Sequence, residues 1–106
     1  EIGDVINHQR TECLLAHVHV ALLEPAAAVH HAERSLQLAG EAGESYGAFD
    51  QVYSHDAAAS AYQISGSAHE AQHHRSKVEA ARALLTDQTE QRVANEWLNR
   101  RESAAN

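Results

Sequence analysis

The chain repeats part of its own pattern after 43 residues, and this internal repeat limits the fold more than any other feature. Four sets of residues correspond at that offset: Ala16 with Ala59, Ala28 with Ala71, His30 and His31 with His73 and His74, and Arg34 with Lys77. Self-similarity at a period of about 40 residues indicates a supersecondary unit that is used twice and stacked on itself. We therefore expect two copies of one unit within a single domain.

Apolar and small residues recur every three or four positions along most of the chain, which is typical of helices with one buried face. Breaks rich in glycine, proline and serine separate five such segments, and no stretch alternates with period two, so we expect no strands. The pattern predicts an all-α domain of two antiparallel helical hairpins and a closing helix, at about residues 5–42, 48–85 and 89–102.

The first helix, at about residues 5–23, is apolar on nearly every side over residues 13–23, which predicts burial on several sides. Cys13 lies in this run and is expected to be a small buried hydrophobe, because a single cysteine cannot form an internal disulfide. For the fourth helix, Ser67 and Glu70 offer a capping box, and Thr89 offers an N-cap for the fifth.

The net charge argues against two classes of partner. The 15 acidic and 8 basic side chains give a charge of −7, which repels nucleic-acid phosphates and anionic lipid headgroups.

No apolar stretch approaches the roughly 20 residues needed to cross a bilayer, and the N-terminus lacks the basic start of a signal peptide. We therefore expect a cytoplasmic protein. Because the chain contains no methionine, we also expect residues before Glu1, with a further helix as one alternative.

Residues 69–73, His-Glu-Ala-Gln-His, match the H-E-x-x-H pattern of helical zinc sites. The fourth helix has a predicted buried stripe of Ala71, Val78, Ala81 and Leu85. With about 100° of rotation per residue, His69 and His73 lie opposite this stripe and should point into solvent. A catalytic zinc needs three protein ligands and a cavity that excludes water. We therefore expect no enzyme and no cofactor. A histidine-rich metal-binding protein is the alternative function, with His69 and His73 as weak candidate ligands, and a small zinc hydrolase ranks below it.

The run Ser54-His55-Asp56 contains the residue types of a catalytic triad, but consecutive residues on a helix point to different sides. We therefore interpret it as an exposed polar stretch.

Small and aromatic residues recur in a further order along both hairpins: Leu15-Ala16, His19 and Ala28 in the first, and Ala58-Ala59, Tyr62 and Ala71 in the second. This order resembles that of the tetratricopeptide repeat family over about residues 11–85. The chain departs from the family in its longer period, in alanine at the usual glycine, and in Glu12 and His55 at the large first position. The resemblance implies hairpins stacked as a right-handed array.

The resemblance also implies a concave groove, lined by the first helix of each hairpin, that receives a peptide or a partner helix. The matching residues are Arg10, Cys13 and His17 in the first copy and Tyr53, Asp56, Ser60 and Gln63 in the second, with Glu96 and Asn99 on the last helix. The implied function is a protein–protein interaction module, with a regulatory role in a longer chain as one form of it.

Two hairpins and one helix are expected to leave an apolar end face, because repeat arrays need about three units. Residues before Glu1, the last helix, or a second copy in a two-fold homodimer would cover it. The residues expected at such a contact are Val5, Ile6, Val93, Trp97 and Leu98.

Overall fold

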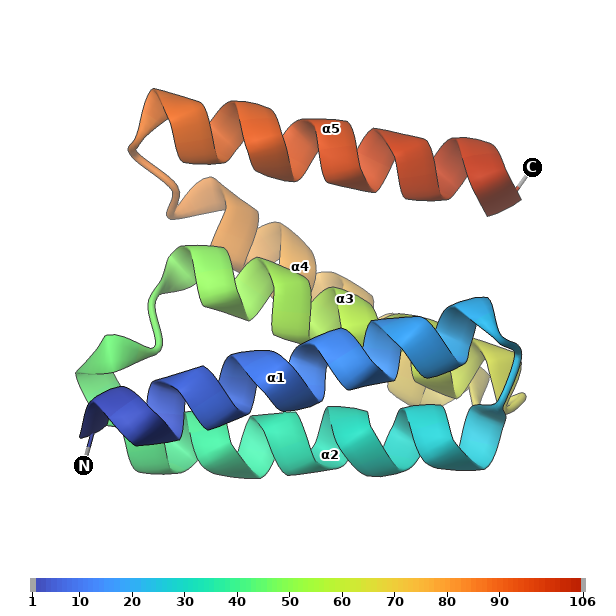
Figure 1. Ribbon diagram of the computed structural model, residues 1–106. Coiled ribbons are helices and arrows are strands. Elements are labelled where there is room, and N and C mark those ends of the chain that lie inside the picture. The colour runs from blue at the N-terminus through green and yellow to red at the C-terminus, as the bar shows by residue number, and fades with distance from the viewer. Residues whose placement is uncertain (1, 106) are drawn as a thin grey trace.

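The structure is a computed structural model that describes the backbone of residues 2–105 and the side chains of residues 3–101. Within this part of the chain every regular element is helical: α1 (Ile2–Ala21), α2 (Pro25–Ala42), the 3₁₀ turn η1 (Gly43–Ser45), α3 (Ala48–Ile64), α4 (Ala68–Ala83) and α5 (Gln88–Ala105). Helices α1, α3 and α5 run in one direction and α2 and α4 return between them (Figure 1). The predicted all-α class with five antiparallel neighbouring helices is confirmed.

The turns that close the two hairpins have the same backbone geometry. Each follows the Schellman pattern at a helix end, through two amide-to-carbonyl bonds: Leu23 to Val20 and Glu24 to His19 in the first turn, and Gly66 to Gln63 and Ser67 to Tyr62 in the second. Each bond of the second turn lies 43 residues after its counterpart, which is the offset found in the sequence.

The first turn carries a large side chain where the second carries glycine. Leu23 has a φ of 56° and Gly66 has a φ of 83°, so both lie in the left-handed region. A β-carbon costs roughly 1–2 kcal/mol in this conformation, a cost that glycine avoids. The Leu23 side chain is also 74% exposed, so burial does not offset the strain.

We expect Leu23→Gly to raise the free energy of unfolding by about 0.5–1 kcal/mol, because relief of the left-handed strain exceeds the added entropy of the unfolded chain. Urea denaturation followed by circular dichroism measures the change. The matched control is Leu22→Gly, one residue earlier, where φ is not positive. There we expect a loss of about 0.5–1 kcal/mol. Equal losses at the two positions would contradict the assignment of strain to Leu23.

The core consists mostly of alanines arranged in two clusters. One joins α1, α2 and α3 through Cys13, Ala16, Ala28, Ala32, Ala57, Ala58 and Ala61. The other joins α3, α4 and α5, together with Leu85 from the segment between α4 and α5. Its members are Val52, Val78, Ala81, Leu85, Ala94 and Leu98. The radius of gyration is 13.0 Å, equal to the roughly 13 Å expected for a compact domain of this length. Small side chains therefore allow the helices to pack closely.

Two predicted helix caps are wrong. Ser67 is the N-cap residue of α4, but its side chain makes no bond to the helix backbone, so the predicted capping box does not form. At the start of α5, Asp87 rather than Thr89 is the cap, and its Oδ1 accepts a bond of 2.9 Å from the amide of Glu90. The helix begins at Gln88, so Thr89 already lies inside it.

The expectation that α1 is buried on several sides is also wrong. Leu14 is 64% exposed and Val18 is 43% exposed, because no described helix covers this face of α1.

The homodimer contact predicted from the terminal helices fails at two of its residues. Ile6 and Leu98 are buried within the domain, and Leu98 packs in the cluster that holds α5. Neither side chain is free to contact a second copy.

Candidate binding groove

Two hollows adjoin on the face formed by α1, α3 and α5, and together we call them the groove. The first hollow, of about 380 Å³, is lined from α1 by Gln9, Arg10, Cys13, Leu14 and His17, and from α3 by Phe49, Asp50, Tyr53 and Ser54. The second, of about 480 Å³, is lined by His17, Val20 and Ala21 of α1, Ser60 of α3, and Trp97, Arg100 and Arg101 of α5. His17 belongs to both hollows, and α2 and α4 line neither.

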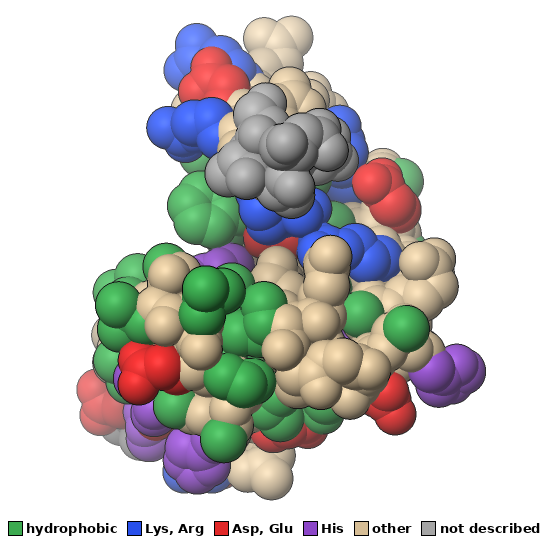
Figure 2. Space-filling view, turned by 90° about the vertical axis from the view of Figure 1, so that its right-hand side faces the viewer, with side chains coloured by type: hydrophobic (Ala, Val, Ile, Leu, Met, Phe, Trp, Pro, Cys, Tyr) green, Lys and Arg blue, Asp and Glu red, His purple; other side chains and the backbone are tan. Residues whose placement is uncertain are grey.

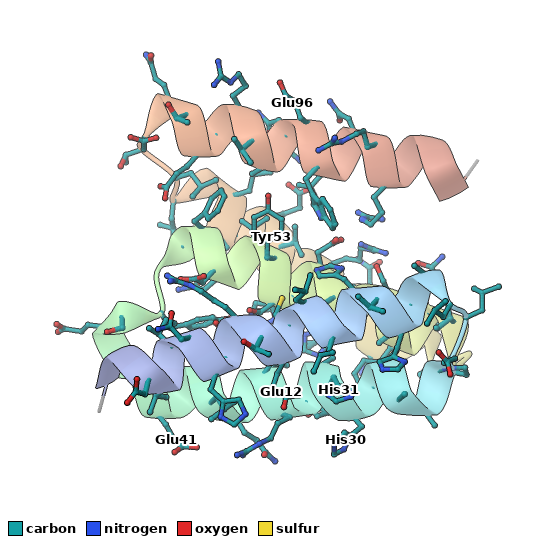
Figure 3. All side chains as sticks on the ribbon, in the orientation of Figure 1. Glu12, His30, His31, Glu41, Tyr53 and Glu96 are labelled. Atoms are coloured by element: carbon teal, nitrogen blue, oxygen red, sulfur yellow. The ribbon has the colours of Figure 1, made fainter. Side chains whose placement is uncertain are left out.

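Aromatic rings connect the three helices across the floor of the groove. The ring of Trp97 lies 5.4 Å from that of Tyr53 and 5.1 Å from that of His17, measured between centroids. Phe49 extends the contact along α3, with its centroid 5.0 Å from Tyr53. His17 Nε2 donates to the carbonyl of Tyr53 at 3.2 Å, which fixes the orientation of the imidazole. Tyr53 projects between α1 and α5 (Figure 3).

Asp56 lies beneath this floor and does not reach the groove surface. Its side chain is fully buried, so the expectation that it contacts a partner is wrong. Arg75 Nη1 donates to Oδ1 at 2.9 Å, Trp97 Nε1 donates to Oδ2 at 3.0 Å, and Arg101 Nε lies 2.6 Å from Oδ1. One carboxylate on α3 thus connects α4 with α5. It holds Trp97 and Arg101, which both line the second hollow.

The other predicted partner-binding residues divide into two groups. Arg10, His17, Tyr53 and Ser60 line the groove, as does Cys13. Gln63 lines neither hollow, and its Oε1 accepts a bond of 3.0 Å from Arg75. Glu96 lies on the side of α5 that faces away from α1 (Figure 3), and Asn99 lines neither hollow.

A buried amide supports the first hollow from below, and the sequence did not reveal it. Gln9 is 1% exposed, and its Nε2 donates to Ser35 Oγ at 2.9 Å and to Ser54 Oγ at 2.6 Å. These bonds join α1, α2 and α3. The interpretation of residues 54–56 as an exposed polar stretch is therefore wrong, because Ser54 and Asp56 are both buried. A single glutamine on a mixed helix face gives no signal of its buried partners.

Burial keeps two ionisable groups of the groove, Cys13 and His17, uncharged at neutral pH. Desolvation raises the pKa of the Cys13 thiol to about 12, so the thiol is protonated at neutral pH and is a poor nucleophile. Desolvation also lowers the pKa of His17, although the Asp56 carboxylate opposes this shift. Arg10 stays charged at the outer edge, where Nε and Nη2 donate to the two carboxylate oxygens of Asp50 at 2.9 Å each.

Apart from His17, the histidines lie on the two hairpins and outside the groove. His69 and His73 are exposed, as predicted. No group of three or more histidine, cysteine or acidic side chains suitable for a metal ion occurs among the residues that the structure describes. The contacts Glu12 to His31, at 2.6 Å, and His55 to His74, at 3.0 Å, connect the helices of each hairpin at equivalent positions. Figure 3 shows the first of these pairs between α1 and α2.

We expect the free energy of unfolding to decrease as the pH falls from about 6.5 toward 4. Desolvation lowers the pKa of His55 to about 4 and also lowers that of His74. The unfolded chain then binds more protons than the folded one, so acid favours unfolding across this window. Desolvation raises the pKa of Glu12, but bonds from His31 and His8 lower it by a larger amount, so the net shift is downward. Glu12 therefore changes the free energy of unfolding only at pH below about 4.5.

Urea midpoints measured at several pH values test this dependence. His55→Gln should flatten the change between pH 6.5 and 4.5. His69→Gln is the matched control and should leave the change unaltered, because this side chain is exposed. A pH profile identical in wild type and His55→Gln would contradict the assignment to the His55–His74 pair.

No protein-family model, no curated protein and no solved structure matches the chain. None of the helices within residues 2–105 is both long and apolar enough to cross a membrane.

Proposed function

We propose that this chain is a protein–protein interaction module that receives a peptide or helix of a partner protein in the groove. The observation that carries the proposal is the pair of adjoining hollows lined only by α1, α3 and α5. Their residues include tyrosine, tryptophan and arginine, the types that most often dominate binding energy at protein interfaces. The proposal assigns no catalytic chemistry and no cofactor to the chain.

The geometry of the groove favours a large ligand over a small one. Its two hollows extend along α1 from Gln9 to Ala21. A helix rises about 1.5 Å per residue, so this length matches several residues of a bound chain. Apolar walls with a few polar groups at their edges are typical of such recognition surfaces.

We also propose that the two hairpins are copies of one tetratricopeptide-like unit, stacked as a right-handed array. The support is the repeated Schellman turn, with Leu23 and Gly66 at equivalent left-handed positions. The contacts from Glu12 to His31 and from His55 to His74 add a second correspondence at the same offset.

The test uses peptides selected from a random peptide display library on the immobilised protein. We expect Tyr53→Ala to weaken binding of the selected peptides by tenfold or more, because an aromatic anchor in the groove floor is lost. The matched control is Tyr62→Ala, on the same helix but outside the groove, where it contacts Glu33 and His74. Circular dichroism checks that both variants retain their helicity. Equal affinities for wild type and folded Tyr53→Ala would reject the groove as the binding surface.

A further inference from the structure

An exposed apolar ridge runs along α1 into the turn that follows it. Leu14, Val18 and Leu22 are spaced four residues apart and are 64%, 43% and 61% exposed. Leu22 follows the last residue of α1, but its amide still donates to the carbonyl of Val18 at 3.0 Å. The helical geometry therefore extends to Leu22, and the three side chains form one row of the kind that packs into the groove of a neighbouring helix.

Leu23 adds an exposed apolar side chain directly after this row, at a cost that the fold does not require. It is left-handed and largely exposed, whereas the equivalent turn of the second hairpin has Gly66 at the same position. A strained and exposed large apolar residue favours a role in binding over one in stability. Figure 2 shows hydrophobic side chains gathered on the left, below the indentation that separates them from α5.

The wall that α5 contributes to the second hollow is cationic. Val20 and Ala21 line the second hollow from α1, Arg100 and Arg101 line it from α5, and no acidic side chain takes part. Asp56 neutralises Arg101. Arg100 is exposed and makes no ion pair with any side chain that the structure describes. In a chain whose net charge is −7, this wall is complementary to an acidic ligand.

We propose that the ridge of Leu14, Val18, Leu22 and Leu23 docks an amphipathic helix of a partner protein, which places an acidic side chain against Arg100. This inference rests on the proposed function and specifies the partner segment: the ridge borders the groove, which Leu14 lines, whereas Val18, Leu22 and Leu23 lie outside both hollows. A helix fits because its apolar residues, three and four apart, match the spacing of the ridge. An extended peptide fits less well, since the described helices offer no free strand edge for backbone pairing.

The test uses two synthetic 18-residue helical peptides that share one leucine stripe and lack tryptophan. Glutamates flank the stripe in one peptide and lysines flank it in the other. Trp97 is the only tryptophan of the chain and lines the second hollow, so its fluorescence reports binding directly. We expect the glutamate peptide to bind at least tenfold more tightly than the lysine peptide. Arg100→Glu should reverse this preference, and Arg92→Glu, outside the groove on the same helix, should preserve it.

The double substitution Leu22→Gln with Leu23→Gly should weaken binding of the glutamate peptide at least tenfold while the protein stays folded. Leu84→Gln is the matched control, because Leu84 is also 64% exposed but lies at the end of α4 and is not part of the ridge. No binding of the glutamate peptide to wild type, or equal binding to wild type and the double variant, would overturn the inference.

Two other occupants of the ridge are outcomes of the same variants. If sedimentation finds a wild-type dimer that the double substitution dissociates, the ridge binds a second copy and the inference is wrong. It is equally wrong if wild type binds phosphatidylcholine–phosphatidylserine vesicles and the double variant does not. If selected peptides depend on Tyr53 but not on Leu22 and Leu23, only the inference fails. If they depend on neither, the proposed function fails as well.

Discussion

Replacement of Asp56 by alanine is expected to lower the free energy of unfolding by about 2–3 kcal/mol. The change removes the acceptor of Trp97 and the counter-charge of Arg75 and Arg101. Loss of one partner from a buried ion pair typically costs about 3–5 kcal/mol. We expect less here because both arginine side chains are 25% exposed and can turn toward water.

The same substitution should loosen α5. Asp56 lies on α3 and binds Trp97 of α5 and Arg75 of α4, so its carboxylate connects α5 to both helices. Trp97 emission should shift to longer wavelength in Asp56→Ala before the chain unfolds, because the indole becomes more exposed. Urea denaturation followed by fluorescence and by circular dichroism separates this local change from global unfolding.

Asp50→Ala is the matched control for Asp56→Ala. Asp50 also binds an arginine, with two bonds of 2.9 Å to Arg10, but the Arg10 side chain is 55% exposed. An exposed ion pair contributes about 0–1 kcal/mol, so we expect a small effect. If Asp56→Ala were as stable as Asp50→Ala and kept the Trp97 emission of wild type, the buried carboxylate would not be what holds α5.

The helices and the breaks between them could be predicted from the sequence because they depend on local spacing. Ala71, Val78 and Ala81 follow each other at intervals of seven and three residues, about two turns and one turn of a helix, and all three are buried on one face of α4. The exposure of His69 and His73 followed from the same geometry. Position around a helix axis is a local property, so a pattern of apolar residues reveals it.

The depth of a side chain could not be predicted in the same way. Tyr53, Asp56 and Ser60 share one face of α3, yet Tyr53 lines the groove and Asp56 is fully buried. The difference comes from Trp97 and the arginines of α4 and α5, which are distant in the sequence. The backbone of Leu23 was unpredictable for another reason, because glycine is the residue usually found in the left-handed position.

The alanine core makes a second large effect expected, at Ala58. This residue is fully buried in the cluster that joins α1, α2 and α3. Ala58→Leu adds three carbon atoms within a cluster whose buried members are alanines and one cysteine, so the helices must separate. Overpacking of this kind typically costs about 1–3 kcal/mol, and we expect about 3 kcal/mol because close helix contact offers no space for repacking. Thermal denaturation measures the loss.

The matched control for Ala58→Leu is Ala80→Leu, which makes the same substitution at an exposed position of α4. There we expect a change within about 0.5 kcal/mol, since the leucine side chain can extend into solvent. Equal stability of the two variants would mean that the contact between the hairpins accommodates a large side chain, and that alanine is not required for their spacing. A loss confined to Ala58→Leu would instead identify close helix approach as the feature that fixes the relative position of α1 and α3, and with it the shape of the first hollow.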